Sequence, residues 1–469
     1  MTIWHPDLSG RTGPLARRLA DAIGEAVASG ALPEGARLPP QRDLAHALGV
    51  SLNTVTRAYA DATARGFVQG AVGRGTYVRT TAPPPDADEA ADLIRPAAGP
   101  IDLARNLPTP GAADAALATT LATLAQSDGL SAVLDDQTAG DPPSWAAAHA
   151  AAGAQWLAGL GLPGADPDRL VLTTGAQHGI LVALLATLAP GDVLLTEALT
   201  YAPLKALTRS LGLRIHPVAD ADGSLSPDAL AAACGRVAAR ALYCLPTLHT
   251  PTTATQDAAR RAALAEVARA HDLTLIEDDV FGALPPDRPP ALATFAPERT
   301  LYITSVSKTL TPGLRVGYVL APPDRVQAVR TAVTLSCWMP PPLMAEIAAR
   351  WIGDGTAARL TEAQREEAAA RQALARDLLT NPDVRADPHG FHVWVPLPPG
   401  WQPDAFRAEA RSRGVEIVTA GAFAVDPAAA PSAIRLCLSH ERRRARVHAG
   451  LSVIADLLQG GPPRDTLVL

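Results

Sequence analysis

The stretch Ser305-Val306-Ser307-Lys308-Thr309-Leu310, followed by Pro312-Gly313-Leu314-Arg315, decides how most of this chain is interpreted. It holds one of only two lysines, Lys205 and Lys308, among 41 basic residues, so that the other 39 are arginine. Arginine cannot replace a neutral amine, because it never deprotonates in a protein and forms no Schiff base. Lys308 is therefore a candidate for a covalent imine with a carbonyl cofactor. The alternative is that Lys308 is a loop residue without a chemical role.

Composition limits the class of protein. At 469 residues the chain exceeds one ordinary domain, and no run reaches the roughly 20 apolar residues of a membrane span. The N-terminus shows no basic leader before an apolar segment. The four cysteines lack the spacing of a metal site or a disulfide framework: Cys234, Cys244, Cys337 and Cys437. We therefore expect a cytoplasmic protein with free thiols, no metal and no membrane contact.

Charge is divided unevenly along the chain. Residues 1–80 hold nine arginines against six acidic residues, a net +3, whereas the rest holds 32 basic against 41 acidic residues, a net −9. The overall net charge of −6 argues against nucleic-acid binding by the whole protein, but the basic N-terminal part suggests a separate task there. Residues 79–98 form a Pro-, Ala- and Asp-rich run without apolar periodicity, which predicts a linker.

Before this linker the pattern predicts three helices and a hairpin. Apolar residues at one-face helical spacing occupy residues 14–28, and further helices are expected at 41–48 and 53–64. Residues 68–78 then read as a strand, a glycine-containing bend and a second strand. This is the layout of a winged helix-turn-helix, which we place at residues 11–78.

The segment from Leu38 to Tyr59, together with the wing at 72–78, resembles the DNA-reading domain of the GntR family over about 65 residues. The resemblance implies a recognition helix that carries polar side chains into the major groove. Leu52 and Thr56 stand where many members of the family carry arginine or another polar residue, so the preferred operator stays open. The alternative is a small interaction module with solvated arginines. The candidate DNA-contacting residues are Arg42, Ser51, Asn53, Thr54, Arg57, Gly73 and Arg74.

After the linker, short apolar segments alternate with Ala-rich helical ones such as 176–189 and 257–271. Because the apolar segments are suited to burial on both faces, they predict a mainly parallel sheet in an α/β fold. A long helix over 355–380 and strands at 392–396 and 434–438 predict a smaller C-terminal α+β lobe. The expected sheet strands are 169–174, 192–196, 214–218, 241–245, 273–276 and 301–304.

Residues 99–462 resemble the fold-type I aminotransferases, and a GntR head fused to such a body is the MocR-type regulator architecture. The resemblance implies a pyridoxal 5′-phosphate (PLP) aldimine at Lys308. It also implies that Asp278 pairs with the pyridinium nitrogen and so keeps the ring an electron sink. The strand-to-helix turn Gly175-Ala176-Gln177 suits the cofactor phosphate, because helix N-terminal amides attract anions.

Further positions match the family's ligand set. Ser305, Ser307 and Arg315 match phosphate ligands, and Arg315 offers a forked charged contact. Tyr201 matches the aromatic residue that stacks on the pyridine ring, and Arg435 matches the arginine that grips the α-carboxylate of a substrate or effector. Each signal alone is weak, since a lone tyrosine more often only packs. Their number and order favour PLP.

Three positions depart from the family pattern. Thr250 replaces an asparagine and Phe281 replaces a tyrosine, two groups that usually hydrogen-bond the cofactor's phenolic oxygen, and a tyrosine expected near residues 135–137 is missing. Loss of these donors is expected to favour a protonated aldimine. We therefore expect exchange with an amine ligand and slow or absent transamination, unless His249 supplies a substitute donor.

Two functions fit these features. The first is a PLP-dependent transcriptional regulator: its body senses PLP, a small amine or an amino acid, and its heads, paired on a homodimer, bind operator half-sites. The second is an active class I/II aminotransferase with a non-functional DNA-binding head. A PLP-storage role has no positive feature in the sequence. The effector, the operator and the direction of regulation stay open. The basic cluster at 441–446 is expected to belong to a solvated terminal helix.

Overall fold

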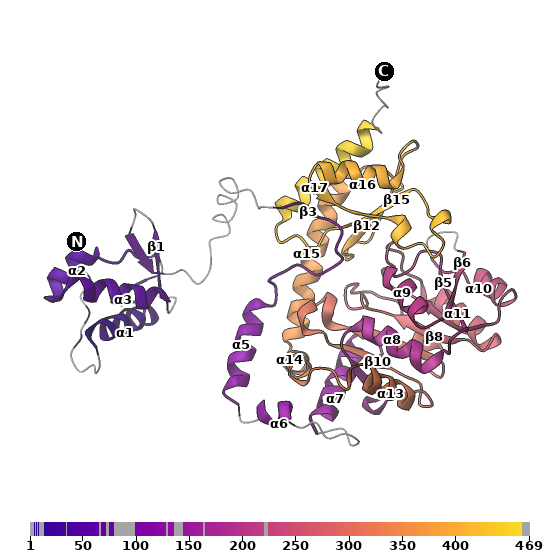
Figure 1. The fold of residues 1–469 in the computed structure, drawn as a ribbon, viewed down its shortest axis with the longest axis horizontal. Helices are drawn as coiled ribbons and strands as arrows, with labels where there is room; N and C mark the ends of the chain where they lie inside the picture. Colours follow the sequence, from indigo (N-terminus) through magenta and orange to yellow (C-terminus); the bar gives the residue numbers. More distant parts are fainter. Residues whose placement is uncertain are drawn as a thin grey trace. The chain divides into compact units, whose positions relative to one another are not determined.

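The computed structural model describes residues 14–33, 35–64, 67–71, 75–78, 99–127, 130–135, 144–162, 165–219 and 224–461, together with Trp4, Pro6 and Leu8. The chain forms two compact units, residues 1–98 and 99–469 (Figure 1). The predicted linker at 79–98 and the wing residues Gly73 and Arg74 lie outside the described residues. Each unit is described by itself.

The N-terminal unit is the predicted winged helix-turn-helix. Its elements are α1 (Leu15–Ala28), α2 (Gln41–Leu48), α3 (Leu52–Ala64), β1 (Val68–Ala71) and β2 (Gly75–Val78). The two strands pair antiparallel, with Val68 opposite Val78. Leu44 and Val55 bring α2 and α3 into one buried core. Gly49 ends α2 with a φ of 65°, the left-handed conformation that glycine adopts without strain.

The larger unit is built on a seven-stranded sheet of order β4-β10-β9-β8-β7-β5-β6. Every neighbouring pair is parallel except those of β10, which runs antiparallel to β4 and β9. The predicted mainly parallel sheet is therefore confirmed. Its strands are β4 (Leu170–Thr173), β5 (Val193–Glu197), β6 (Arg214–Val218), β7 (Ala239–Cys244), β8 (Thr274–Asp278), β9 (Thr300–Ser305) and β10 (Gly317–Leu320).

Helices cover both faces of this sheet because its strands are apolar on both sides. On β9, Tyr302 packs in one cluster with α7 and α14, and its neighbour Ile303 packs in another with α8 and α13. Within the described residues, no helix has the length and apolar character needed to cross a membrane. The helices before and around the sheet are α5 (Asp114–Ala125), α6 (Leu130–Asp135), α7 (Ser144–Gly159), α8 (Ala176–Thr187), α9 (Ala202–Ser210), α10 (Pro227–Cys234), α11 (Ala258–Ala270), α12 (Leu292–Phe295), α13 (Val326–Cys337) and α14 (Pro342–Gly353).

The C-terminal lobe is α+β, as predicted. Its antiparallel sheet has the order β11-β12-β15-β14, and the first strand of the body, β3, pairs in parallel with β13. The chain therefore enters this lobe immediately after the linker region and only then reaches the large sheet (Figure 1). The elements are β3 (Ile101–Asp102), α15 (Thr356–Leu378), β11 (Arg385–Ala386), β12 (His392–Pro396), α16 (Pro403–Ser412), β13 (Val415–Glu416), β14 (Val418–Thr419), β15 (Ala433–Cys437) and α17 (Arg444–Gly460).

Candidate functional site

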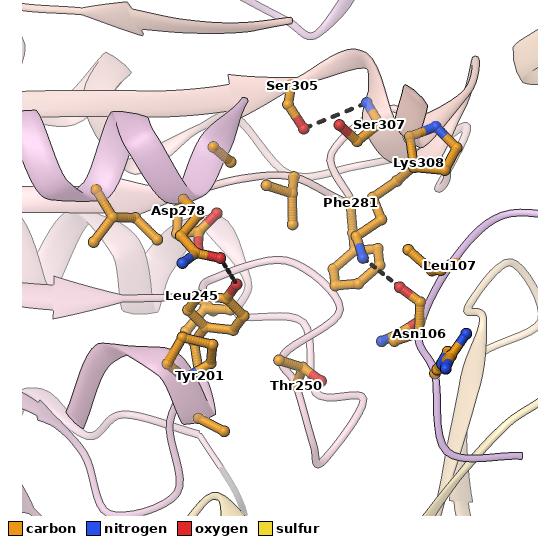
Figure 2. Close-up of a pocket in the computed structure, with 18 of the residues that line it drawn as sticks. Asn106, Leu107, Tyr201, Leu245, Thr250, Asp278, Phe281, Ser305, Ser307 and Lys308 are labelled. Carbon is orange, nitrogen blue, oxygen red and sulfur yellow. Dashed lines mark hydrogen bonds between the residues drawn. The ribbon is translucent and has the colours of Figure 1, made fainter. Parts of the chain in front are cut away.

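A cavity of about 480 Å³ lies at the edge of the large sheet where β8 and β9 end (Figure 2). Ligands bind at this edge in open α/β sheets. Gly175 caps the N-terminus of α8, directly before the lining residue Ala176. Eleven residues predicted from the sequence line the cavity: Ala176, Gln177, Tyr201, Thr250, Asp278, Phe281, Ser305, Ser307, Lys308, Arg315 and Arg435.

Lys308 extends into this cavity from the turn after β9 (Figure 2). Its Nζ donates a hydrogen bond to the backbone oxygen of Asn106 and lies 5.2 Å from the centre of the Phe281 ring. Burial lowers the pKa of the Lys308 amine to about 8. An amine with this pKa is partly neutral near neutral pH, which attack on a carbonyl carbon requires.

Asp278 ends β8 and presents one oxygen without a protein partner. Its Oδ2 accepts a hydrogen bond of 2.6 Å from the Tyr243 hydroxyl, whereas its buried Oδ1 has no hydrogen-bond partner among the described residues. Burial raises the pKa of the Asp278 carboxyl to about 6, against the opposing hydrogen bond from Tyr243. The carboxylate therefore has one oxygen held in place and one left for a ligand.

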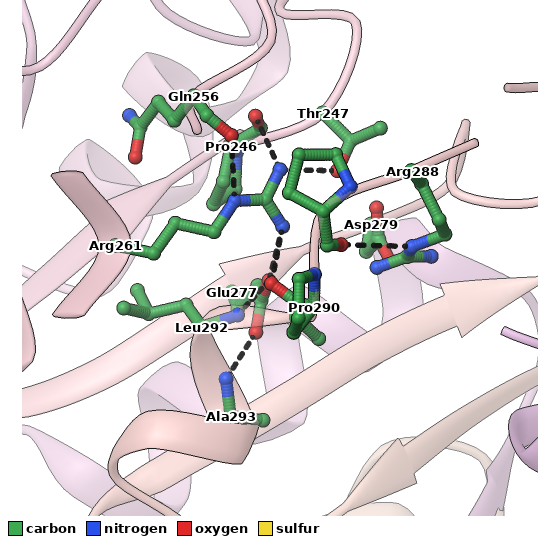
Figure 3. A network of polar contacts seen from close by, with 12 residues as sticks. Pro246, Thr247, Gln256, Arg261, Glu277, Asp279, Arg288, Pro290, Leu292 and Ala293 are labelled. Atoms are coloured by element: carbon green, nitrogen blue, oxygen red, sulfur yellow. Dashed lines mark hydrogen bonds and ion pairs between the residues drawn. The ribbon is translucent and has the colours of Figure 1, made fainter. Parts of the chain in front are cut away.

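Two other carboxylates flank Asp278 in sequence, but they belong to a buried ion network (Figure 3). Both Glu277 oxygens accept backbone N–H groups of α12, at 2.9 and 2.8 Å, and Asp279 lies 2.6 Å from the Arg288 guanidinium. Burial raises the pKa of Glu277 to about 7, whereas Arg288, acting against burial, holds the pKa of Asp279 below its usual value. Side chains alternate along a strand, so the middle carboxylate alone faces the cavity.

The part of the cavity beside Arg315 suits an anion. The Arg315 Nη2 donates a 3.1 Å hydrogen bond to the Thr174 oxygen, and a Cβ placed on Gly175 would come within 2.7 Å of that nitrogen. Gly175 therefore allows the guanidinium to approach the start of α8, where no side chain caps the free amides. The buried Ser307 hydroxyl has no hydrogen-bond partner within the described part of the chain.

Arg435 reaches the cavity from β15 in the C-terminal lobe. Its guanidinium lies 4.8 Å from the centre of the Phe423 ring, and its Nη2 donates to the backbone oxygen of Ala104. Its Nε is buried and has no acceptor among the residues that the structure describes. The side chain is thus held in place with donor capacity left for a carboxylate.

Two of the positions that depart from the family pattern, Thr250 and Phe281, also line the cavity, whereas residues 136 and 137 of the third lie outside the described residues. The Thr250 hydroxyl is buried without a partner in the described residues, and the Phe281 ring packs edge-on against Phe391. His249 has both ring nitrogens engaged, Nδ1 with the Thr252 hydroxyl at 2.7 Å and Nε2 with a backbone oxygen at 3.0 Å. Burial lowers the pKa of His249 to about 4. His249 therefore has no free N–H to offer a cofactor.

Several site residues were missed by sequence reasoning, among them Tyr243, Arg105 and Asn106. Tyr243 lies inside the apolar strand β7 and looks like a core residue there. Arg105 and Asn106 follow β3 and line the cavity from a segment without a motif. The sequence positions of Arg105 and Asn106 do not indicate that they lie near Lys308, because only the fold of the C-terminal lobe brings these residues together.

Of the candidate DNA-contacting residues that the structure describes, Arg42 lies on α2, Ser51 directly precedes α3, and Asn53, Thr54 and Arg57 lie on α3. Ser51 caps α3, since its hydroxyl accepts the Thr54 N–H at 3.2 Å. Asn53, Thr54 and Arg57 line a groove of about 410 Å³ together with Arg17 at the start of α1. Arg42 is exposed on α2 and Leu52 is exposed on α3, whereas the Thr56 hydroxyl donates a 2.8 Å hydrogen bond to the Gln41 side chain.

Comparisons with known proteins agree with both units. Residues 120–449 match the model of the aminotransferase class I and II family, and residues 15–78 match that of the bacterial regulatory proteins of the gntR family. The chain is 27% identical to the HTH-type transcriptional regulator YdeF of Bacillus subtilis, over 97% of this chain and 96% of the relative. It is 30% identical to the vitamin B6 salvage pathway transcriptional repressor PtsJ of Salmonella typhimurium, over 84% and 88%. An archaeal alanine:glyoxylate aminotransferase shares the fold, with a TM-score of 0.70 and 22% identity over 80% of this chain and 94% of that one.

Proposed function

We propose that this chain, which belongs to the aminotransferase class I and II family and carries a gntR-family head in the MocR-type arrangement, is a DNA-binding transcriptional regulator. It would hold PLP at Lys308 and sense PLP, a small amine or an amino acid. One observation carries the proposal. A single cavity joins the Lys308 amine, the Asp278 carboxylate, an anion site beside Arg315 and the Arg435 guanidinium. Two relatives that match most of the chain are named as transcriptional regulators, YdeF (itself uncharacterized) and PtsJ.

The described residues fit PLP. A polar ligand in this cavity would meet groups that are buried without a hydrogen-bond partner in the described chain. These are Asp278 Oδ1, Ser307 Oγ and Thr250 Oγ1. Asp278 would hold the pyridine nitrogen, Tyr201 would pack on the ring, and Lys308 would hold the aldehyde carbon. When bound, PLP supplies an aldehyde that condenses with amines and a ring that withdraws electrons. The phosphate would be held by Gly175, Ala176, Gln177, Ser305, Ser307 and Arg315.

The chain's own residues favour sensing over turnover. Tyr243 orients Asp278, and Arg435, which contacts the Ala104 backbone oxygen, would hold the carboxylate end of an amino acid. Thr250 and Phe281 leave fewer donors for the phenolic oxygen than the family pattern provides, so we propose that amines exchange at the site with slow or absent transamination. The second function, an active aminotransferase with a non-functional head, would be favoured by stoichiometric formation of pyridoxamine phosphate from amino acids.

The pKa of Lys308 sets the pH dependence of PLP uptake. Only the neutral amine attacks the aldehyde, so the uptake rate rises about tenfold per pH unit below 8 and levels off above it, because the pKa of Lys308 is about 8. Stopped-flow absorbance of the imine band across pH 6–10 measures this. Lys205→Arg is the matched control and leaves the profile unchanged. A rate that keeps rising up to pH 10 without levelling off, as for an exposed lysine, contradicts the assignment.

We propose that the head occupies residues 11–78, that 79–98 form a linker and that 99–462 form the cofactor-binding body. Polar residues at the start of α3 would face base edges, and Arg42, Arg57 and the wing residue Arg74 would contact phosphates or bases. The wing glycine Gly73 would let the backbone approach DNA. Arg17 joins this set, because it lines the same groove as Arg57.

Arg57→Ala is expected to weaken binding to all DNA sequences and to lower the salt slope, d log K/d log[salt], by about 1, since one phosphate contact is lost. Fluorescence anisotropy with a labelled duplex at several salt concentrations measures the slope. Arg236→Ala, which removes an exposed arginine from the larger unit, is the matched control and leaves the slope unchanged. Equal slopes for wild type and Arg57→Ala would place Arg57 outside the DNA contact.

We also propose a homodimer, so that two heads meet repeated half-sites. Leu335 and Trp338, at the C-terminal end of α13, are 82% and 53% exposed, and Leu185 on the neighbouring helix α8 is 44% exposed. Exposed apolar side chains that gather on neighbouring helices are typical of protein–protein contacts, whereas single ones are not. Covering them with a second copy removes this apolar surface from water.

A further inference from the structure

The segment after β3 lines the cavity next to two of its cationic groups, Lys308 and Arg435. The backbone oxygens of Ala104 and Asn106 accept hydrogen bonds from Arg435 and Lys308, respectively. Asn106 and Leu107 face Lys308 across the cavity (Figure 2). The segment that carries Asn106 therefore contacts both groups to which the proposed function assigns the amine and the carboxylate of a ligand.

His392, on β12, has only one possible hydrogen-bonding state. Its Nε2 lies 3.2 Å from the backbone oxygen of His249, and a carbonyl oxygen only accepts, so Nε2 carries the proton. Burial, assisted by the positive charge of Arg435, lowers the pKa of His392 to about 3. The ring is neutral, and its Nδ1 therefore offers a lone pair and no hydrogen.

This state of His392 fixes the orientation of the Asn106 amide. The Asn106 Nδ2 lies 3.3 Å from the His392 Nδ1 and must donate to it, because the amide oxygen would meet a second lone pair there. The amide oxygen is consequently turned away from His392. Asn106 Oδ1 is buried and has no hydrogen-bond partner among the described residues.

Apolar side chains line the cavity beside Asn106, together with the charged groups named above. Leu107 and Phe281 line the same cavity, and the centre of the Phe281 ring lies 5.8 Å from that of His392. A buried acceptor without a donor is costly to maintain, and a ligand that supplies the donor removes the cost. A site built around such an acceptor discriminates against ligands that lack the matching hydrogen-bond donor.

We propose that Asn106 is a specificity-determining residue: its Oδ1 accepts a hydrogen bond from a hydroxyl or amide N–H on the side chain of an amino-acid ligand. His392 is the positioning residue that holds the amide in this orientation. The inference rests on the proposed function, which places PLP at Lys308 and the ligand carboxylate at Arg435. The ligand class is thus amino acids with a side-chain hydrogen-bond donor.

The test compares isosteric ligands on the PLP-loaded full-length protein. Serine is paired with 2-aminobutyrate and threonine with valine, and the change in the visible imine band gives each dissociation constant. The wild type is expected to bind the hydroxyl member of each pair about tenfold more tightly. Asn106→Leu reduces this ratio to about one. His392→Phe also reduces it, because the amide is then free to turn, and Asn381→Leu, in a surface turn, leaves it unchanged.

The outcomes separate this inference from the proposed function. Absence of an imine band in the wild type contradicts the proposed function before any ligand is added. A normal band with equal affinities within each pair, or with a preference that survives in both Asn106→Leu and His392→Phe, overturns the role of Asn106. Retention of the PLP band in each variant shows that it is folded, and Asn106→Ala replaces Asn106→Leu if the larger side chain prevents loading.

Discussion

Replacing Lys308 by alanine abolishes the visible absorbance band that PLP forms with the protein, and DNA binding by the head persists. The reason is chemical: Lys308 is the lysine that lines the cavity, whereas Lys205 donates its hydrogen bond to the Ala424 oxygen outside it. No other residue type in the cavity offers an aliphatic primary amine. Absorbance spectra of the purified variant with added PLP measure the loss.

Two matched variants complete this first test. Lys308→Arg keeps the positive charge but cannot form an imine, so its spectrum matches that of Lys308→Ala. Lys205→Arg keeps the band at full intensity. Persistence of the band in Lys308→Ala would show that another amine binds PLP and would remove the basis of the cofactor assignment.

Replacing Arg435 by leucine lowers the affinity for amino-acid ligands about a hundredfold, because a charge-assisted contact to the carboxylate is lost. The PLP band keeps its intensity, since Arg315 and the start of α8 form the anion site in another part of the cavity. Absorbance titrations of the PLP-loaded protein with amino acids give the affinities.

Simple alkylamines are the control ligands for this second test. They carry no carboxylate, so wild type and Arg435→Leu bind them with equal affinity. Unchanged amino-acid affinity in the variant would mean that the carboxylate lies elsewhere, and an equal loss for alkylamines would point to damage of the whole cavity.

The sequence allows the fold class and most of the site to be predicted because the relevant chemistry restricts residue types. An imine requires lysine, and Lys308 stands out in a chain that otherwise uses arginine. Strand β10 escapes prediction, because it follows β9 through short turns without an intervening helix and so breaks the strand–helix alternation. Asp278 is distinguished from its acidic neighbours by strand alternation only once the register of β8 is known.

Asn106 and His392 mark the limit of sequence reasoning. They are 286 positions apart and meet because β3 joins the C-terminal lobe, a pairing of two-residue strands that leaves no periodic signal. Tyr243 is hidden for a different reason, since a tyrosine in a buried strand has the same pattern as core packing. Both cases depend on long-range contacts, which local patterns do not encode.

Coupling between the cofactor site and DNA binding is the central claim, and one measurement tests it most directly. The DNA upstream of the protein's own gene is titrated with protein at fixed salt, with and without PLP and candidate amino acids, and anisotropy gives the dissociation constant. The account predicts a change of at least about fivefold with the effector in the wild type and none in Lys308→Ala. Equal dissociation constants for the wild type under all these conditions, or the same change in Lys308→Ala, would contradict it.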